Sequence, residues 1–199
     1  MKRYLIATVG AAGLLGLAAC GDGANETAVG QTDAVNAAQD ATSAVVGQTS
    51  AATLGANTLE GYVDNAAIGD MYEIEAGRMA QERGVSAETK ALGEMLVSDH
   101  TAAAERMAGL ARAAGETLPT EMDERRQGLI DNLRAAEGAE FDRVFAEQQV
   151  AAHEEAITLH EGFADNTDHP ELAAFAGEMV PKLRTHLERA RALETATDQ

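Results

Sequence analysis

Residues 86–115 read SAETKALGEMLVSDHTAAAERMAGLARAAG, and this stretch decides the fold class. Ser86 is suited to cap the start of a helix, and Gly115 is suited to end it. Between them the apolar residues recur every three or four positions, as on one face of an amphipathic helix: Leu92, Leu96, Ala103, Met107 and Leu110. The stretch therefore predicts one long helix with a single apolar face.

The same helical spacing of apolar residues continues on both sides of this helix, from Thr58 to the C-terminus. We find no alternating strand pattern and no Asn-Gly hairpin turn in these residues. Thr120 with Asp123 resembles a capping box that opens a short helix. The predicted helices cover residues 58–83, 86–115, about 120–136, 139–164 and about 170–193. Four long helices and a short crossover helix predict an all-α four-helix bundle in residues 58–199.

The N-terminal residues have the layout of an export signal. Lys2 and Arg3 precede an apolar run over residues 4–17, which is shorter than the roughly 20 residues that cross a bilayer. The Leu-Ala-Ala-Cys sequence that ends at Cys20 resembles a bacterial lipobox. This resemblance implies a lipoprotein signal peptide over residues 1–19 and acylation of Cys20; an ordinary signal peptide with an accidental Cys is the alternative.

Acylation at Cys20 would hold the protein on a membrane surface. Gly21 follows Cys20 in place of the Asp that favours retention in the inner membrane, so we expect the outer membrane, with the protein facing the periplasm. Residues 20–57 contain no aromatic residue and no Lys or Arg, which predicts a flexible low-complexity tether. A short amphipathic helix around residues 34–46 is the alternative for part of it.

The composition excludes several classes of function. A formal net charge of −18 over 199 residues argues against nucleic acid, because phosphates repel such a surface. A single Cys excludes a disulfide framework and a cysteine-based metal cluster. We find no nucleophile elbow, no His-Glu-x-x-His motif and no phosphate-binding glycine loop, so we predict no catalytic residues and favour a non-enzymatic function.

Polar side chains lie on the apolar faces of the long predicted helices. Asp70 and Glu73 share a face of the first helix, His100 lies on that of the second, and His186 on that of the last. His153 lies at the edge of the corresponding face. At 1.5 Å per residue, Glu73 and the three histidines lie near the middle of helices about 40 Å long. We therefore expect these side chains to converge at mid-bundle.

Imidazole and carboxylate groups together suit Zn, Cu, Fe or Mn. We predict a transition-metal site formed by His100, His153 and His186, with Glu73 or Asp99 as a fourth ligand or as the partner that orients a histidine. Asp70 is expected either as a ligand or as a buried hydrogen-bond partner. The competing interpretation is that the histidines are buried and hydrogen-bonded and only specify packing. His160 and His169 are predicted at the surface or in a loop.

Several short motifs together resemble one known family, the bacterial "domain of unknown function 4142", which is grouped with the ferritin-like bundles. The resemblance covers about Thr58 to Leu193, and Val180 stands where the family usually has Leu. The motifs are Glu73-Ile74-Glu75, Gly77-Arg78-Met79-Ala80, Val97-Ser98-Asp99-His100-Thr101, Leu118-Pro119, Phe141-Asp142, Gln149-Val150-Ala151-Ala152-His153, Pro170-Glu171-Leu172 and Val180-Pro181-Lys182-Leu183-Arg184-Thr185-His186-Leu187.

The resemblance implies a ferritin-like bundle, often exported or lipid-anchored, and supplies no activity. No histidine has Glu three residues before it, so the Glu-x-x-His pairs of di-iron sites are absent. Two functions stay open. One is an envelope lipoprotein that binds a metal at mid-bundle. The other is a non-catalytic structural or interaction lipoprotein of the envelope whose acidic face meets a protein partner, the cell wall or cations. In that case the buried histidines only specify packing. The sequence does not indicate an oligomeric state.

Overall fold

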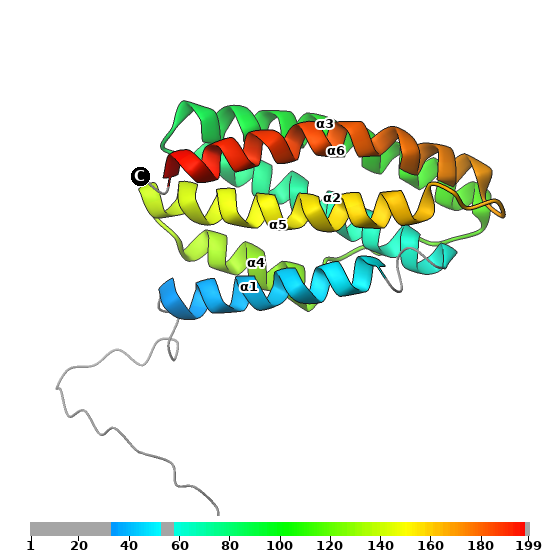
Figure 1. Cartoon of the computed structure of the whole chain (residues 1–199), viewed down its shortest axis with the longest axis horizontal. Coiled ribbons are helices and arrows are strands. Elements are labelled where there is room, and N and C mark those ends of the chain that lie inside the picture. Colours follow the sequence, from blue (N-terminus) through cyan, green and yellow to red (C-terminus); the bar gives the residue numbers. More distant parts are fainter. Residues whose placement is uncertain (1–32, 53–57, 198–199) are drawn as a thin grey trace, which may run out of the picture. The chain divides into compact units, whose positions relative to one another are not determined.

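The computed structural model describes residues 33–52 and 58–197, and Figure 1 shows their arrangement. The described residues form helices and contain no strand, which confirms the predicted all-α fold. None of these helices is both long enough and apolar enough to span a bilayer. The helices are α1 (Asp33–Ser50), α2 (Leu59–Arg83), α3 (Ala87–Ala114), α4 (Glu124–Ala135), α5 (Ala139–Phe163) and α6 (Pro170–Thr197).

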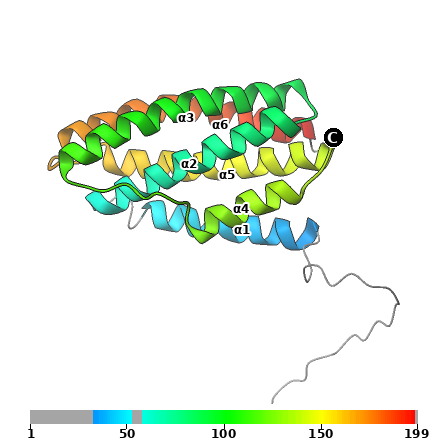
Figure 2. The same cartoon turned by 180° about the vertical axis from the view of Figure 1, so that it is seen from behind.

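The four long helices α2, α3, α5 and α6 form the predicted bundle. Helix α2 packs beside α3 and α5, while α6 packs beside α5 and α3. The colours in Figure 1 show that α3 and α5 run in the same direction, so the chain between them must return along the bundle. The returning segment includes α4, which packs against α2 and α5. Figure 2 shows α4 from the opposite side of the molecule. Helix α4 is thus the predicted crossover helix.

Side-chain caps set where three of the helices begin. Thr58 accepts a hydrogen bond from the backbone N–H of Gly61 and caps α2, and Ser86 accepts from Thr89 N–H and caps α3. Asp123 caps α4 by accepting from the backbone N–H of Arg126. The prediction that Thr120 opens the short helix is therefore wrong, because the carboxylate of Asp123 takes the capping position three residues later.

The prediction of a flexible tether over residues 20–57 is wrong for the part that forms helix α1. Residues 33–50 of that segment are helical, close to the alternative considered for residues 34–46, and α1 packs against α4 and α5. The contact is polar, since Asp40 accepts hydrogen bonds from the side-chain amides of Asn132 and Gln148, at 2.6 and 2.7 Å. Hydrogen bonds to a charged group contribute more than ordinary ones, which allows a helix whose buried positions are Asn36, Ser43 and Gly47 to dock. The predicted signal peptide and Cys20 lie outside the described residues.

The bundle contains two apolar clusters with a polar layer between them. In α3, Leu96 belongs to the first cluster and Ala103 to the second, and His100 lies between them. In α6, Leu183 and Ala190 enclose His186 in the same way. A row of polar side chains therefore crosses the bundle at the height that the sequence predicts.

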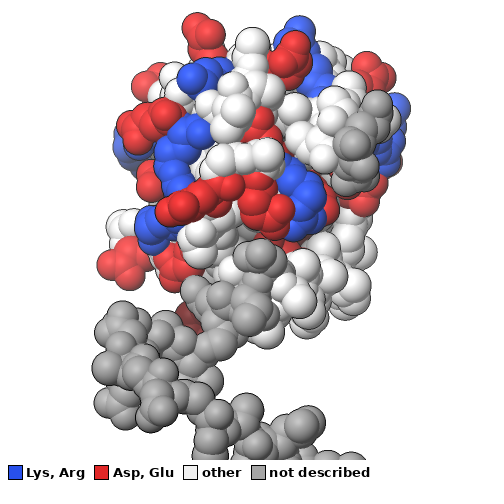
Figure 3. All heavy atoms as spheres, turned by 90° about the vertical axis from the view of Figure 1, so that its left-hand side faces the viewer, with Lys and Arg blue, Asp and Glu red and all other residues white. Residues whose placement is uncertain are grey.

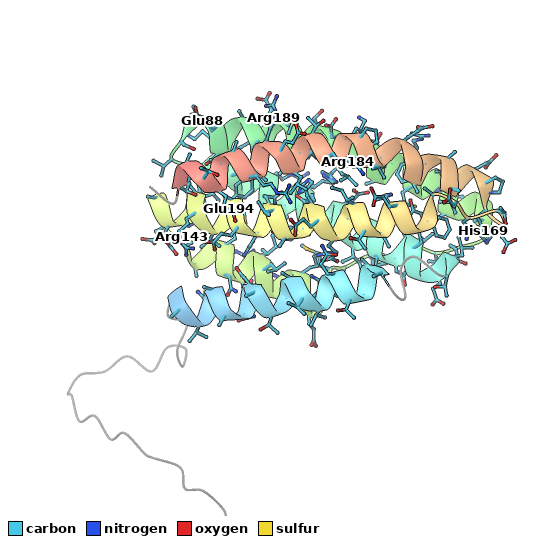
Figure 4. All side chains as sticks on the ribbon, in the orientation of Figure 1. Glu88, Arg143, His169, Arg184, Arg189 and Glu194 are labelled. Atoms are coloured by element: carbon cyan, nitrogen blue, oxygen red, sulfur yellow. The ribbon has the colours of Figure 1, made fainter. Side chains whose placement is uncertain are left out.

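Charges of both signs are interspersed at one end of the molecule. Figure 3 shows acidic and basic side chains side by side on the end where α5 begins and α6 ends. Arg143, labelled at this end in Figure 4, forms ion pairs with Glu140 and Glu147 of its own helix. This end therefore does not present an uninterrupted acidic patch, despite the net charge of −18.

Candidate metal site

Three histidines from three helices meet in the polar layer. His100 of α3, His153 of α5 and His186 of α6 each offer one ring nitrogen, and these nitrogens lie within 4.8 Å of one another. The three side chains are buried, with at most 3% of each residue exposed. The predicted convergence of these residues is thus present in the structure.

The other nitrogen of each ring faces an oxygen atom. His100 Nδ1 lies 2.8 Å from Asp70 Oδ1, His153 Nδ1 lies 2.9 Å from the backbone carbonyl of Gln149, and His186 Nε2 lies 2.9 Å from Asp99 Oδ2. A carbonyl and an ionised carboxylate can only accept hydrogen bonds, so the ring nitrogen must donate. This assigns the proton of each neutral ring to its outer nitrogen and leaves a lone pair on the inner one.

The inner nitrogens of His153 and His186 face each other. His153 Nε2 lies 3.2 Å from His186 Nδ1, and two lone pairs at this separation repel unless a cation lies between them or beside them. Zinc bound tetrahedrally at 2.0–2.1 Å places two nitrogen ligands roughly 3.3–3.4 Å apart. The observed separation therefore suits two ligands of one metal ion, and a shared proton is the other cation that would remove the repulsion.

His100 supplies the third nitrogen. Its Nε2 is buried and has no hydrogen-bond partner among the described residues. Buried polar atoms are nearly always satisfied in folded proteins, so an unsatisfied one marks a place for a water or an ion. The longest separation among the three nitrogens must shorten by up to roughly 1.4 Å for tetrahedral zinc, which lies within reach of side-chain rotation.

Protonation differs among the three rings. Burial lowers the pKa of His153 well below its ordinary value, and it also lowers the pKa of His186 despite the hydrogen bond to Asp99. Burial acts in the same direction on His100, but the hydrogen bond to Asp70 and the charge of Glu73 outweigh it and raise the pKa of His100. The pKa of His100 is therefore shifted in the opposite direction from the pKa values of His153 and His186.

The carboxylates lie on the outer side of the histidines. Asp70 and Asp99 each bond the outer nitrogen of a histidine, so they orient the imidazole rings and do not face the inner nitrogens. Glu73 Oε1 lies 3.8 Å from the outer nitrogen of His153, and its Oε2 is buried without a hydrogen-bond partner. Burial raises the pKa of Glu73 to about 7. Each histidine thus has a carboxylate beside it.

The remaining histidines have different positions. His160 is buried and forms a hydrogen bond with the hydroxyl of Tyr62, at 3.1 Å, so the prediction of a surface or loop position is wrong for this residue. Tyr62 and Phe175 cover the flank of α5 that carries His160. His169 lies in the loop between α5 and α6, as predicted, and Figure 4 shows it at that end of the bundle.

The sequence patterns missed one charged group near the site. Arg126 of α4 is buried and pairs with the buried carboxylate of Glu155 in α5. Its positive charge lies close enough to the layer to oppose the rise in pKa that burial causes at Asp70 and Glu73. Arg126 directly follows Arg125 in a polar helix, and no apolar stripe marked it as inward, so sequence periodicity offered no signal for it.

These features define an all-α bundle with a buried histidine and carboxylate layer at mid-height, a place where helical bundles commonly build metal and cofactor sites. The chain belongs to the family described as "Domain of unknown function (DUF4142)", whose family model matches residues 28–193. This confirms the resemblance that the motifs predicted, and the match includes α1. No curated protein sequence and no solved structure shows a significant match to the chain.

Proposed function

We propose that this protein is an exported envelope lipoprotein whose bundle binds one transition-metal ion through His100, His153 and His186. The observation that carries the proposal is the arrangement of ring nitrogens. The outer nitrogen of each ring donates to an oxygen, and the other offers a lone pair within 4.8 Å of its counterparts. Orienting hydrogen bonds of this kind accompany most histidine ligands of metals.

The ligand set narrows the choice among Zn, Cu, Fe and Mn. Imidazole suits Zn, Cu and Fe, whereas Mn prefers carboxylate and water ligands. Because Asp70 and Asp99 bond outer nitrogens, the inner ligands are nitrogen atoms only, which favours Zn or Cu over Mn. Three protein ligands leave one coordination position for water or for Glu73, whose Oε2 is buried without a hydrogen-bond partner.

Charge balance also supports a cation at this place. Asp70, Glu73 and Asp99 lie beside the three rings, while Arg126 supplies one buried positive charge on the α4 side. Of these carboxylates Asp70 and Glu73 are buried, which is costly unless positive charge accompanies them. A divalent ion among the histidines would lower that cost, and it would also occupy the position at which the ring lone pairs repel.

The test is the metal content and metal affinity of the full-length chain purified without an affinity tag. We expect one equivalent of Zn²⁺ or Cu²⁺ in the wild type, with loss of binding in His100→Ala and His186→Ala. His169→Ala is the matched control, because that residue lies in a loop away from the layer and should leave binding unchanged. A wild-type chain that binds no metal under any loading condition would overturn the proposal and favour the structural or interaction role.

The location in the envelope has its own test. The proposal requires acylation at Cys20, so Cys20→Ala should release the protein from membranes into the soluble periplasmic fraction. Fractionation of cells that carry either form, followed by immunoblotting, measures this. Retention of the Cys20→Ala protein in the membrane fraction would contradict a lipid anchor at this residue, whatever the outcome of the metal experiment.

A further inference from the structure

We propose that Asp99 and Lys182 form the route by which the metal ion reaches the buried histidines. The inference rests on the proposed function and deepens it, since it names the place where the ion first binds. Asp99 would capture the ion at the surface between α3 and α6. Lys182 would hold that carboxylate while the site is empty, and an arriving ion would displace the ammonium group.

Exposure distinguishes Asp99 from the other carboxylates of the layer. The side chains of Asp70 and Glu73 are 9% and 6% exposed, whereas that of Asp99 is 30% exposed. Within the described residues, Asp99 is therefore the carboxylate that touches both a histidine of the site and the solvent. A hydrated cation that approaches this side meets Asp99 before any of the buried rings.

His186 connects Asp99 to the inner nitrogens. Its Nε2 lies 2.9 Å from Asp99 Oδ2, and its Nδ1 lies 3.2 Å from His153 Nε2. The ring itself is 1% exposed, so solvent does not reach it directly. An ion held by Asp99 thus lies one imidazole away from the convergence point, and a local rotation of His186 would carry it from the outer to the inner position.

Lys182 already places a positive charge at the outer oxygen of Asp99. Its Nζ lies 3.5 Å from Asp99 Oδ1, and its side chain is 53% exposed. Exposed ion pairs contribute little to stability, so a divalent ion can displace this ammonium group at little cost. The ion pair shows that the carboxylate of Asp99 favours a cation beside it. Because the pair is exposed, a metal ion from solvent can reach this carboxylate.

The test is the rate at which the full-length, metal-free protein takes up Co²⁺, followed by stopped-flow absorbance of the cobalt complex. Removing the negative charge with Asp99→Asn should slow association by about tenfold or more, because a local carboxylate concentrates cations. Lys182→Gln should accelerate association a few-fold, because the ion no longer competes with the ammonium group. Measuring at about 0.5 M salt suppresses the contribution of distant charges.

Glu161 and Arg184 provide the matched controls. They form an exposed ion pair between α5 and α6, so Glu161→Gln and Arg184→Gln make the same changes in net charge away from the route. The proposal predicts rates within about twofold of wild type for both controls. Circular dichroism confirms that each variant is folded, and Lys182→Gln supplies an independent readout should Asp99→Asn unfold.

Three outcomes would overturn the inference in distinguishable ways. If Co²⁺ binds and Asp99→Asn associates as fast as Glu161→Gln, the route is wrong while the metal site stands. A faster dissociation of Co²⁺ from Asp99→Asn, with unchanged association, would assign Asp99 only to the orientation of His186. If the wild-type chain binds no Co²⁺, Zn²⁺ or Cu²⁺, the proposed function fails and the route fails with it.

Discussion

His160 shows how burial without a charged partner changes the behaviour of a single residue. Its ring lies between Tyr62 and Phe175, and burial lowers its pKa from 6.5 to about 3. In the unfolded chain the residue takes up a proton near pH 6.5, whereas in the folded chain it stays neutral to much lower pH. The unfolded state therefore binds more protons between these two values, and acid destabilises the fold through this residue.

We expect His160→Gln to reduce the acid sensitivity of the protein. His160 makes its full contribution to the free energy of unfolding above about pH 6.5. This contribution is lost as the pH falls towards 3, by up to about 1.4 kcal/mol per pH unit. Urea denaturation at several pH values between about 7 and 4.5 measures the slope, with His169→Gln in the loop as control. An unchanged slope in His160→Gln would show that this histidine is not held neutral in the fold.

Sequence periodicity predicted the inward direction of His100, His153 and His186 but not that of His160. Both histidines of α5 lie on one flank of its apolar stripe, where a pattern assigns burial less firmly than at the centre. In the structure α2 and α6 lie on either side of α5, and Tyr62 with Phe175 closes the flank at His160. The outcome depended on neighbouring helices, which a single helix pattern does not contain.

At the scale of elements, α2 and α3 approach closely where two glycines meet. A methyl group built on Gly93 would lie 2.6 Å from the carbonyl oxygen of Gly77 and 2.8 Å from Ala80 Cβ. The first contact is to the backbone of α2 and the second is to a Cβ fixed directly to it, so neither atom can move aside as the end of a flexible side chain can. The two glycines thus permit a helix spacing that any larger residue would widen.

Gly93→Ala should destabilise the fold, although alanine favours helices by about 1 kcal/mol over glycine. We expect a net loss of about 1–3 kcal/mol, because the added methyl group overpacks the α2 and α3 contact. Gly109→Ala in the same helix is the control; nothing lies within 4 Å of its added methyl, so it should stabilise the fold slightly. Chemical denaturation of both variants tests this, and a stabilised Gly93→Ala would contradict the close approach.

Helix α1 shows why a composition-based prediction can miss an element. Its buried positions are Asn36, Ser43 and Gly47, with Asp40 half-buried, so the inward side carries no apolar stripe. Its larger apolar residues Val35, Val45 and Val46 are exposed instead. Helix α1 docks through hydrogen bonds to α4 and α5, and such partners cannot be read from the sequence of the helix alone.

A bulky residue at Gly47 should release α1 and leave the bundle folded. A Cβ at this position would lie 1.9 Å from Glu155 Oε2, and Glu155 is held by Arg125 and Arg126. We expect Gly47→Leu to raise the hydrogen exchange of backbone amides in residues 33–50 to that of an exposed segment, while the amides of α2, α3, α5 and α6 stay protected. Protection of α1 equal to that of wild type would show that α1 does not depend on this contact.

At the scale of the whole molecule, metal binding should stabilise the fold. The layer joins α3, α5 and α6 between the two apolar clusters, so an ion bound there requires the folded arrangement. An ion present at about 100 times its Kd contributes about 2.7 kcal/mol, which raises the Tm of a chain of this size by about 5 to 11 °C. Thermal melts with Zn²⁺ and with a chelator measure the difference. His153→Ala should abolish it, and an equal rise in that variant would place the ion elsewhere.

The arrangement of four long helices with a crossover helix could be predicted, because their apolar stripes and their Gly and Ser boundaries agree with one another. The convergence of the three histidines followed from their similar heights in these helices. The roles of the carboxylates could not be predicted, since whether Asp99 lies beside the inner or the outer nitrogen of His186 depends on side-chain rotamers. The contacts among Arg126, Glu155 and α1 likewise arise only in the folded arrangement.

X-ray absorption spectroscopy at the zinc edge, on the full-length chain loaded with one equivalent of Zn²⁺, tests the central claim most directly. The account predicts three imidazole ligands with Zn–N distances of about 2.0–2.1 Å, together with one oxygen ligand. In His100→Ala the imidazole contribution should fall or binding should be lost. A zinc environment of oxygen atoms without imidazole, unchanged in His100→Ala and His186→Ala, would contradict a metal site at mid-bundle.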